Sequence, residues 1–256
     1  MKSANVKSKH YAALVVDLDG TLIGRGGQIS PGVAQAVGKV VQRLRVSIAS
    51  GREPSDVLGF ARQLGLTAPQ VSDNGAMILS TSTGRPLWTA PLQPARAREI
   101  VDILRHLGLA LIATHPEGTI TDASEITRWN QVRVSALDME ESQAEELVAR
   151  FSARSELNVV KASLPYNGLW AVDFTAAGVN KGAAVQRMAR MLGIDAVTII
   201  AAGDSYNDLP LLRLCGLRIA MGDAPDELKD IADFVAPSMD EDGLAVAIEE
   251  FVLPRL

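Results

Sequence analysis

A run of apolar residues that ends abruptly in two aspartates constrains this 256-residue chain more than any other stretch. Residues 11–16 (YAALVV) form strands readily and are continuously apolar, as in a strand that a parallel sheet buries on both faces. Asp17 and Asp19 follow with one leucine between them, and side chains two apart on a strand point the same way. Gly20 then allows the backbone to turn. Two carboxylates held this close repel each other and are costly to desolvate, so the pair requires a cation or a proton as compensation.

Strands and helices alternate along much of the chain. Beside the first run, strands are expected at 45–49, 70–72, 197–202, 217–221 and 234–236, and helices at 31–44, 54–65, 180–192, 225–232 and 243–252. Ser30 followed by Pro31 is typical of a helix start, and Gly193 of a helix end. The alternation predicts an α/β fold with a doubly wound parallel sheet, similar to a Rossmann fold.

The alternation is interrupted between Thr83 and Thr175. Helical periodicity there is confined to 94–107 and 139–155, and short strand-like pieces lie at 109–113, 130–135, 158–162 and 169–174. Helices with paired short strands indicate a separate α+β unit. We therefore expect residues 1–82 and 177–256 to form one α/β core, with 83–176 inserted as a smaller α+β domain.

Composition excludes several classes of partner. The formal net charge is −5 and no basic cluster is interleaved with aromatic residues, which argues against nucleic-acid binding. No stretch reaches the length of a membrane span, and the first ten residues lack the apolar segment of a secretory signal. The single cysteine, Cys215, is compatible with a reducing compartment. We expect a cytoplasmic protein that contacts neither membrane nor nucleic acid.

Polar residues or turn formers follow five of the expected strands, namely Asp17, Ser50, Asn74, Asp204 and Asp223. In open parallel sheets the ligand crevice lies beyond the carboxyl ends of the strands, so most of these residues should meet at one rim. Several carboxylates together suit Mg²⁺, which prefers oxygen ligands. A hydroxyl and a lysine such as Lys181 suit a phosphoryl group, and an aspartate can attack phosphorus to form an acyl phosphate.

Four segments resemble, in order and spacing, motifs I to IV of the haloacid dehalogenase superfamily: Asp17-Leu18-Asp19-Gly20-Thr21, Ser50-Gly51-Arg52, Lys181-Gly182 and Gly203-Asp204-Ser205-Tyr206-Asn207-Asp208. Residues 172–174, 178–182, 220–224 and 240–243 resemble the Cof-type branch. The resemblance covers essentially the whole chain. That branch consists of Mg²⁺-dependent phosphatases with an α/β cap inserted between motifs II and III, where the alternation is interrupted here.

The resemblance implies catalytic and metal-binding roles for four aspartates. Asp17 would be the nucleophile and a metal ligand. Asp19 would be the general acid and base, with its backbone carbonyl on the metal. Asp204 would be a further Mg²⁺ ligand, although it could also cap the following helix. Asp208 would support the metal through water or orient Lys181, or could simply complement the start of a helix.

The resemblance also implies a phosphate-binding set, which consists of Ser50, Gly51, Lys181 and Asn207. Lys181 would offset the charge of the nucleophile as well. Lys181 at a helix start is unfavourable without a nearby anion, which supports this role.

The remaining candidates are weaker. Arg52 is either a surface charge or a partner of a carboxylate. Asn74 is expected to form a supporting turn, and Asp223 to cap a helix. In the inserted domain, His115 and Arg128 lie in expected loops that could contact substrate.

These observations predict a Mg²⁺-dependent phosphatase that hydrolyses a small phosphorylated metabolite, such as a sugar phosphate, through an aspartyl-phosphate. The enzyme would act as a monomer or homodimer. Phosphoryl transfer to another acceptor, as in a phosphomutase or phosphotransferase, is the alternative reaction. A phosphate-binding regulatory protein without turnover is the alternative class, against which every catalytic position holds a competent residue.

Overall fold

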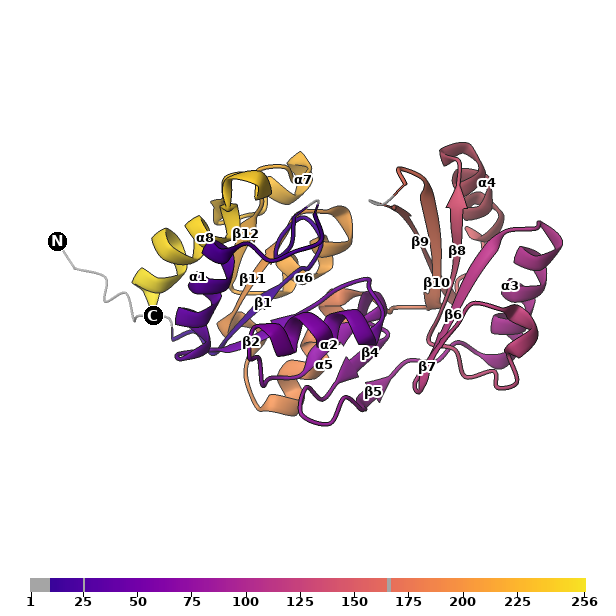
Figure 1. The fold of residues 1–256 in the computed structure, drawn as a ribbon, viewed down its shortest axis with the longest axis horizontal. Helices are drawn as coiled ribbons and strands as arrows, with labels where there is room; N and C mark the ends of the chain where they lie inside the picture. Colours follow the sequence, from indigo (N-terminus) through magenta and orange to yellow (C-terminus); the bar gives the residue numbers. More distant parts are fainter. Residues whose placement is uncertain (1–9, 25, 165–166) are drawn as a thin grey trace.

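The computed structural model describes residues 10–24, 26–164 and 167–256, and these form two units side by side (Figure 1). One unit is built on a five-stranded sheet and the other on a separate five-stranded sheet. The first and last described helices and strands, from residue 13 and up to residue 255, both belong to the first unit, and the second unit is formed by the middle of the sequence (Figure 1). The second unit is therefore an insertion into the first.

The first sheet has the strand order β13-β12-β11-β1-β2, and every pair in it is parallel. Its strands are β1 (Ala13–Val16), β2 (Arg45–Ile48), β11 (Ile199–Gly203), β12 (Leu217–Ala220) and β13 (Phe234–Val235). The apolar run before Asp17 thus supplies an inner strand, β1, between β11 and β2. The prediction of a doubly wound parallel sheet is confirmed.

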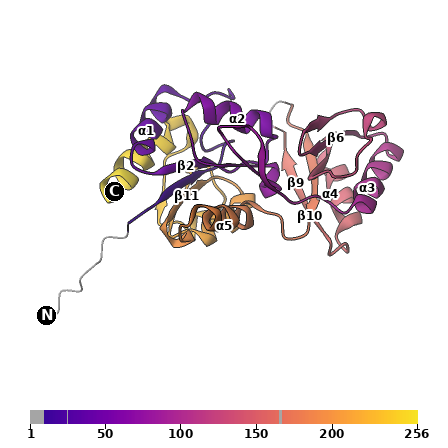
Figure 2. The same cartoon turned by 90° about the horizontal axis from the view of Figure 1, so that it is seen from below.

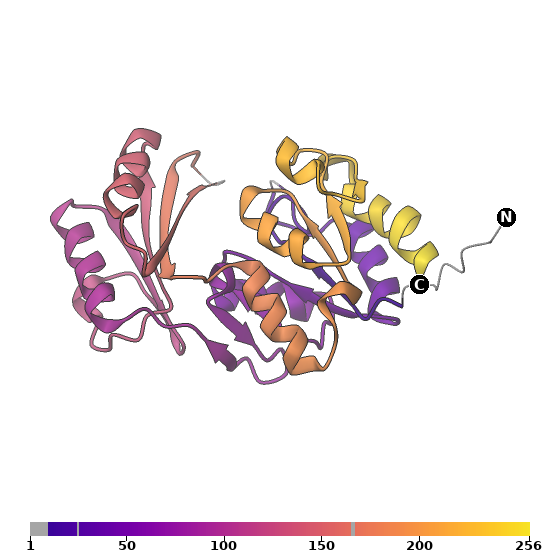
Figure 3. The same ribbon diagram turned by 180° about the vertical axis from the view of Figure 1, so that it is seen from behind.

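Helices cover both faces of this sheet, because successive side chains of β1 point to opposite sides. Leu14 and Val16 pack into a core with α1 (Pro31–Val41), α2 (Pro54–Gln63) and α8 (Gly243–Val246). Ala13 and Val15 pack on the other side with α5 (Lys181–Leu192), α6 (Leu209–Leu214) and α7 (Asp226–Lys229). Figure 3 shows α5, in orange, lying in front of the core sheet.

The helix ends follow the expected capping chemistry. The Ser30 hydroxyl accepts a hydrogen bond from the Val33 amide at 3.1 Å, with Pro31 as the first helical residue of α1. Helix α5 ends at Gly193, whose φ of 66° is left-handed. Two expected helices differ in length or form. α7 is only four residues long, and the chain continues beyond α8 as a π-helical turn at Ala247–Val252.

The inserted unit has an antiparallel sheet with the order β7-β6-β8-β10-β9. Its strands are β6 (Ala110–His115), β7 (Gly118–Ile120), β8 (Arg133–Met139), β9 (Leu157–Ser163) and β10 (Trp170–Ala176). Helices α3 (Pro94–His106) and α4 (Glu141–Phe151) pack on one face around Val134, Val172 and Phe174. The strands lie between these helices and the first unit (Figure 2), so the other face of the sheet is turned to the core.

Three strands were not predicted, and one of them is β7 (Gly118–Ile120) at the edge of the inserted sheet. β4 (Met77–Leu79) and β5 (Pro86–Thr89) join β3 (Gln70–Ser72) in a three-stranded antiparallel sheet. Their three- and four-residue lengths are too short for periodicity to reveal, and tertiary pairing decides their conformation. The domain boundary at 82/83 stays a prediction. We propose that the chain passes from the core to the inserted domain later, at residues 90–93, because β5 pairs with β4 rather than with the inserted sheet.

Within the described ranges, no helix has both the length and the apolar character that crossing a membrane would require.

Candidate active site

Polar side chains from three neighbouring strands meet at one end of the core sheet. Asp17 directly follows β1, and Asp204 directly follows β11, the parallel neighbour of β1. Ser50 lies two residues beyond β2, the other neighbour. Because these three strands are adjacent and parallel, their carboxyl ends deliver the three side chains to the same rim.

Lys181 links this rim to a further aspartate. It is the first residue of α5, and its Nζ lies 2.6 Å from Asp17 Oδ1 and 2.7 Å from Asp208 Oδ1. The side chains of Lys181, Asp17 and Asp208 are only 1%, 6% and 0% exposed. The expectation that a nearby anion compensates this lysine at a helix start agrees with these contacts.

Both oxygens of Asp208 are engaged by the protein. Oδ1 accepts from Lys181, and Oδ2 accepts from the backbone amides of Asp204 at 3.1 Å and Ser205 at 3.2 Å. Of the two roles left open for Asp208, this geometry favours orientation of Lys181. Carboxylate oxygens of Asp17, Asp204 and Asp208 lie within 4.8 Å of one another, which brings a set of oxygen donors to one point.

The electrostatics of the cluster reflect an excess of negative charge. Burial of Asp17 raises its pKa well above the ordinary value, and the charge of Asp208 adds to the effect. Burial, with the charge of Asp208, also raises the pKa of Asp204 to about 6. Burial lowers the pKa of Lys181, but Asp17 and Asp208 raise it by more, so the ammonium stays protonated. One ammonium cannot neutralise three carboxylates, and these oxygen donors therefore fit a divalent cation such as Mg²⁺.

Gly20 allows the chain to pass close to this cluster. Its φ is +79°, which strains other residues, and a Cβ atom there would lie 2.2 Å from Asp204 Oδ2. The next residue, Thr21, donates from its hydroxyl to Asp204 Oδ1 at 3.3 Å. The turn after β1 thus contacts the Asp204 carboxylate and helps to hold it in place.

Asp19 is paired with Arg52. The guanidinium donates from NH2 to Asp19 Oδ1 at 2.7 Å and from Nε to Oδ2 at 3.0 Å, in a two-pronged contact. A weaker contact of 3.3 Å joins Arg52 to Asp56. Of the two interpretations left open for Arg52, the structure therefore supports a carboxylate partner.

The residues of the expected phosphate-binding set approach one another through Asn74. The buried Ser50 hydroxyl accepts from the Arg52 amide at 3.1 Å. A Cβ on Gly51 would lie 3.0 Å from Asn74 Oδ1, so the two residues are in close contact. The same Asn74 oxygen accepts from Asn207 Nδ2 at 3.2 Å. Asn74 does lie in a turn, at Asp73–Gly75, with a left-handed φ of 54°.

The sequence analysis missed a buried ionic network between the two units. Arg133 of the inserted sheet donates from Nε to Asp73 Oδ1 at 2.9 Å and from NH1 to Asp173 Oδ1 at 3.3 Å. Asp173 in turn accepts from Asn74 Nδ2 at 2.9 Å. The available signal was the alternation of polar residues in β8 and β10, which marks a polar face opposite the one that packs on α3 and α4.

The weaker candidates from the inserted domain lie close to each other. His115 Nδ1 lies 2.9 Å from Glu117 Oε2, and Arg128 NH1 lies 3.8 Å from Glu117 Oε1. In the described ranges, no hydrogen bond or ion pair joins His115 or Arg128 to the carboxylate cluster. The inserted domain reaches the core at a nearby point instead, where the Thr119 hydroxyl donates to Glu53 Oε2 at 2.7 Å.

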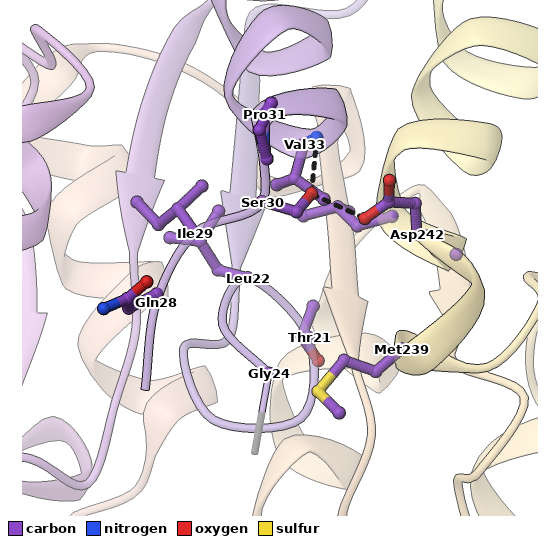
Figure 4. Close-up of a pocket in the computed structure, with 12 residues that line it drawn as sticks. Thr21, Leu22, Gly24, Gln28, Ile29, Ser30, Pro31, Val33, Met239 and Asp242 are labelled. Carbon is purple, nitrogen blue, oxygen red and sulfur yellow. Dashed lines mark hydrogen bonds between the residues drawn. The ribbon is translucent and has the colours of Figure 1, made fainter. Parts of the chain in front are cut away.

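Asp223 does not cap a helix as expected. Its Oδ2 accepts from the Met239 amide at 3.3 Å, and Pro225 occupies the cap position of α7. Met239 also lines a hollow between the β1–α1 loop and the segment before α8 (Figure 4). Asp17, Asp204 and Asp208 do not line this hollow, but Thr21, which donates to Asp204, does.

Comparison with known proteins agrees with this architecture. A family model described as haloacid dehalogenase-like hydrolase matches residues 14–146 and 117–248. A Bacillus subtilis 5-amino-6-(5-phospho-D-ribitylamino)uracil phosphatase is 28% identical over 96% of this chain and 99% of its own length. A phosphoglycolate phosphatase from Archaeoglobus fulgidus is 26% identical over 95% of this chain and 98% of its own. A solved haloacid dehalogenase-like hydrolase from Bacteroides thetaiotaomicron, 22% identical, has the same fold, with a TM-score of 0.82 over 94% of this chain and 99% of its own.

The parallel core, the strand-end carboxylates and the family match together define the class: the chain belongs to the haloacid dehalogenase-like hydrolases. Within that family it is a Cof-type hydrolase, with its second sheet inserted after the first motifs.

Proposed function

We propose that this phosphomonoester hydrolase is a Mg²⁺-dependent phosphatase that acts on a small phosphorylated metabolite through an aspartyl-phosphate. The observation that carries the proposal is the contact of Lys181 Nζ with Asp17 and Asp208 beneath the strand ends. Lys181 binds Oδ1 of Asp17, so in the proposed reaction the other carboxylate oxygen, Oδ2, would be the nucleophile. Asp204 and Asp17 would hold Mg²⁺, which would draw charge from the phosphoryl oxygens when bound.

In the first half of the proposed reaction, an oxygen of Asp17 attacks phosphorus and the bond to the ester oxygen breaks. The leaving oxygen takes a proton from Asp19. In the second half, Asp19 takes a proton from water as that water attacks the aspartyl-phosphate, which releases phosphate and restores Asp17. Lys181 and the Ser50 hydroxyl would hold the phosphoryl oxygens during both halves.

Arg52 adds a condition to the role of Asp19. The guanidinium contacts both oxygens of that carboxylate. With both oxygens turned toward the guanidinium, this carboxyl group is not positioned to pass a proton to the leaving oxygen. We infer that substrate binding displaces Asp19 from at least one of these contacts before the leaving group is protonated.

The relatives suggest a first panel of substrates. Their names include a phosphoribitylaminouracil phosphatase, a phosphoglycolate phosphatase and an HMP-PP phosphatase. One structural neighbour is named as a sugar phosphatase. We propose a substrate of this general kind, a small organic phosphate whose leaving group contacts the inserted domain, which would determine specificity.

The test is phosphate release from such a panel and from a generic aryl phosphate, with Mg²⁺ and with EDTA. Asp17→Asn removes the proposed nucleophile while keeping its size, so turnover should disappear while the circular dichroism spectrum stays unchanged. Full activity of that variant would refute the aspartyl-phosphate route. Product transfer to an acceptor without free phosphate would indicate the phosphotransferase instead. No turnover together with tight phosphate binding would indicate a regulatory protein.

A further inference from the structure

Three hydrogen-bond donors converge on the carboxylate of Asp173, on strand β10 of the inserted sheet. Oδ1 accepts from the Ser135 hydroxyl at 2.5 Å and from Arg133 NH1 at 3.3 Å. Oδ2 accepts from Asn74 Nδ2 at 2.9 Å. The Asp173 side chain is 8% exposed. It is the place where the inserted domain contacts the turn that carries Asn74.

An ionised carboxylate can only accept hydrogen bonds, and this gives the contact a direction. Because Asp173 accepts, Asn74 must turn its amide nitrogen toward it and its oxygen away. That oxygen accepts from Asn207 Nδ2 at 3.2 Å. The oxygen of Asn207 then accepts from the Ser205 hydroxyl at 2.7 Å. The orientation of two amides in the core thus follows from one charge in the inserted domain.

We propose that Asp173 and Arg133 are positioning residues that hold the Asn207 amide with its nitrogen ready to donate to the phosphoryl group. The inference rests on the proposed function, in which Asn207 contacts that group. One hydrogen of Asn207 Nδ2 is used by Asn74, and the second is left for a phosphoryl oxygen. If both amides turned over, the Asn207 nitrogen would face Ser205 and this donor would be lost.

Arg133 also favours hydrogen bonds in which Asp173 is the acceptor. A guanidinium can only donate, so it requires an acceptor at Asp173 Oδ1. In an Asp173→Asn variant, Arg133 would donate to the amide oxygen, and the new NH₂ group would therefore face Asn74. Asn74 would then turn over to offer its oxygen, and Asn207 would follow. Asp73 also holds Arg133, at 2.9 Å, from the same turn that contains Asn74.

The experiment measures kcat/KM for an aryl phosphate, and inhibition by orthovanadate as a phosphoryl mimic. Asp173→Asn should lower kcat/KM and weaken vanadate inhibition by about tenfold to a hundredfold, since a hydrogen bond to a charged group is at stake. Glu145→Gln, which also changes a carboxylate of the inserted domain to an amide but lies at the exposed Lys161 ion pair, is the matched control and should change neither.

Two double variants separate positioning from a general loss of structure. In the double variant Asp173→Asn with Asn74→Asp, the carboxylate stands at position 74 and the amide at position 173. The new carboxylate can only accept, so Asn207 should again donate to it and kcat/KM should recover. Asp173→Asn should also have no further effect in an Asn207→Ala background, because the group through which it acts is gone. A purely structural role would give additive losses in both cases.

Each outcome decides the question. Turnover by the wild type with equal kcat/KM for Asp173→Asn and Glu145→Gln would overturn this inference and leave the phosphatase intact. Additive losses in the double variants would overturn it as well. Vanadate binding to the wild type can be measured by calorimetry. A wild type that neither releases phosphate nor binds vanadate would overturn the proposed function and this inference together.

Discussion

The raised pKa of Asp204 predicts how pH and a divalent cation act on stability. Its pKa of about 6 exceeds the ordinary 3.8 because burial and the charge of Asp208 penalise the ionised form. The folded protein therefore binds this proton more tightly than the unfolded chain does, and stability falls as pH rises. Ionisation of Asp204 lowers the free energy of unfolding by about 3 kcal/mol in total, and the full loss is present above pH 6. The raised pKa of Asp17 acts in the same direction.

The assay is urea unfolding of EDTA-treated protein at about pH 4.5 and about pH 7.5, between which about 2 kcal/mol of that cost develops. Asp204→Asn cannot ionise, so the difference in unfolding free energy between wild type and variant reports the ionisation of this group together with its effect on Asp17. We expect the wild type to lose about 2 kcal/mol relative to the variant over this range.

Mg²⁺ should reverse the loss, because the cation binds the ionised form. Its stabilising effect on the wild type should be large at the higher pH, small at the lower pH, and strongly reduced in Asp204→Asn. A difference between wild type and variant that does not change with pH would refute the reasoning. Equal stabilisation by Mg²⁺ at both pH values would refute it too.

Three other perturbations have definite outcomes. Lys181→Met leaves two buried carboxylates without their shared ammonium and should cost about 3–5 kcal/mol in urea unfolding; a loss below about 1 kcal/mol would contradict the buried network. Gly20→Ala places a Cβ 2.2 Å from an Asp204 oxygen at a left-handed φ, so both the melting temperature and calorimetric Mn²⁺ affinity should fall. Burial raises the pKa of the Cys215 thiol to about 12, so iodoacetamide should label it only after denaturation. Rapid labelling of the folded protein would refute that description.

The core of the fold and site was predictable because strong local signals repeat there. The apolar run before Asp17 has the composition of a strand buried on both faces, and the rule for parallel sheets then places Ser50 and Asp204 at the same rim. The caps at Ser30 and Gly193 use side-chain and glycine chemistry that can be read within a few residues. The structure brings these elements together as expected.

The contacts between the two units were not predictable in the same way. Arg133, Asp73 and Asp173 are far apart in sequence: Arg133 begins β8, Asp173 lies within β10, and Asp73 follows β3. Only the pairing of β8 with β10, and the approach of that sheet to the Asn74 turn, makes them one network. The short strands β4 and β5 were missed for a related reason, since their conformation depends on pairing with β3.

The position of Lys181 in the chain has a consequence for synthesis on the ribosome. Its partner Asp17 precedes it by 164 residues, and the whole inserted domain is made between them. The strand β11, which pairs with β1 on one side, emerges later still. A nascent chain that ends before α5 thus carries Asp17 without the Lys181 ammonium, and its β1 lacks the neighbouring strand β11. The inserted domain, whose strands and helices are contiguous in sequence, is the first unit able to fold, and the catalytic core closes only around a finished cap.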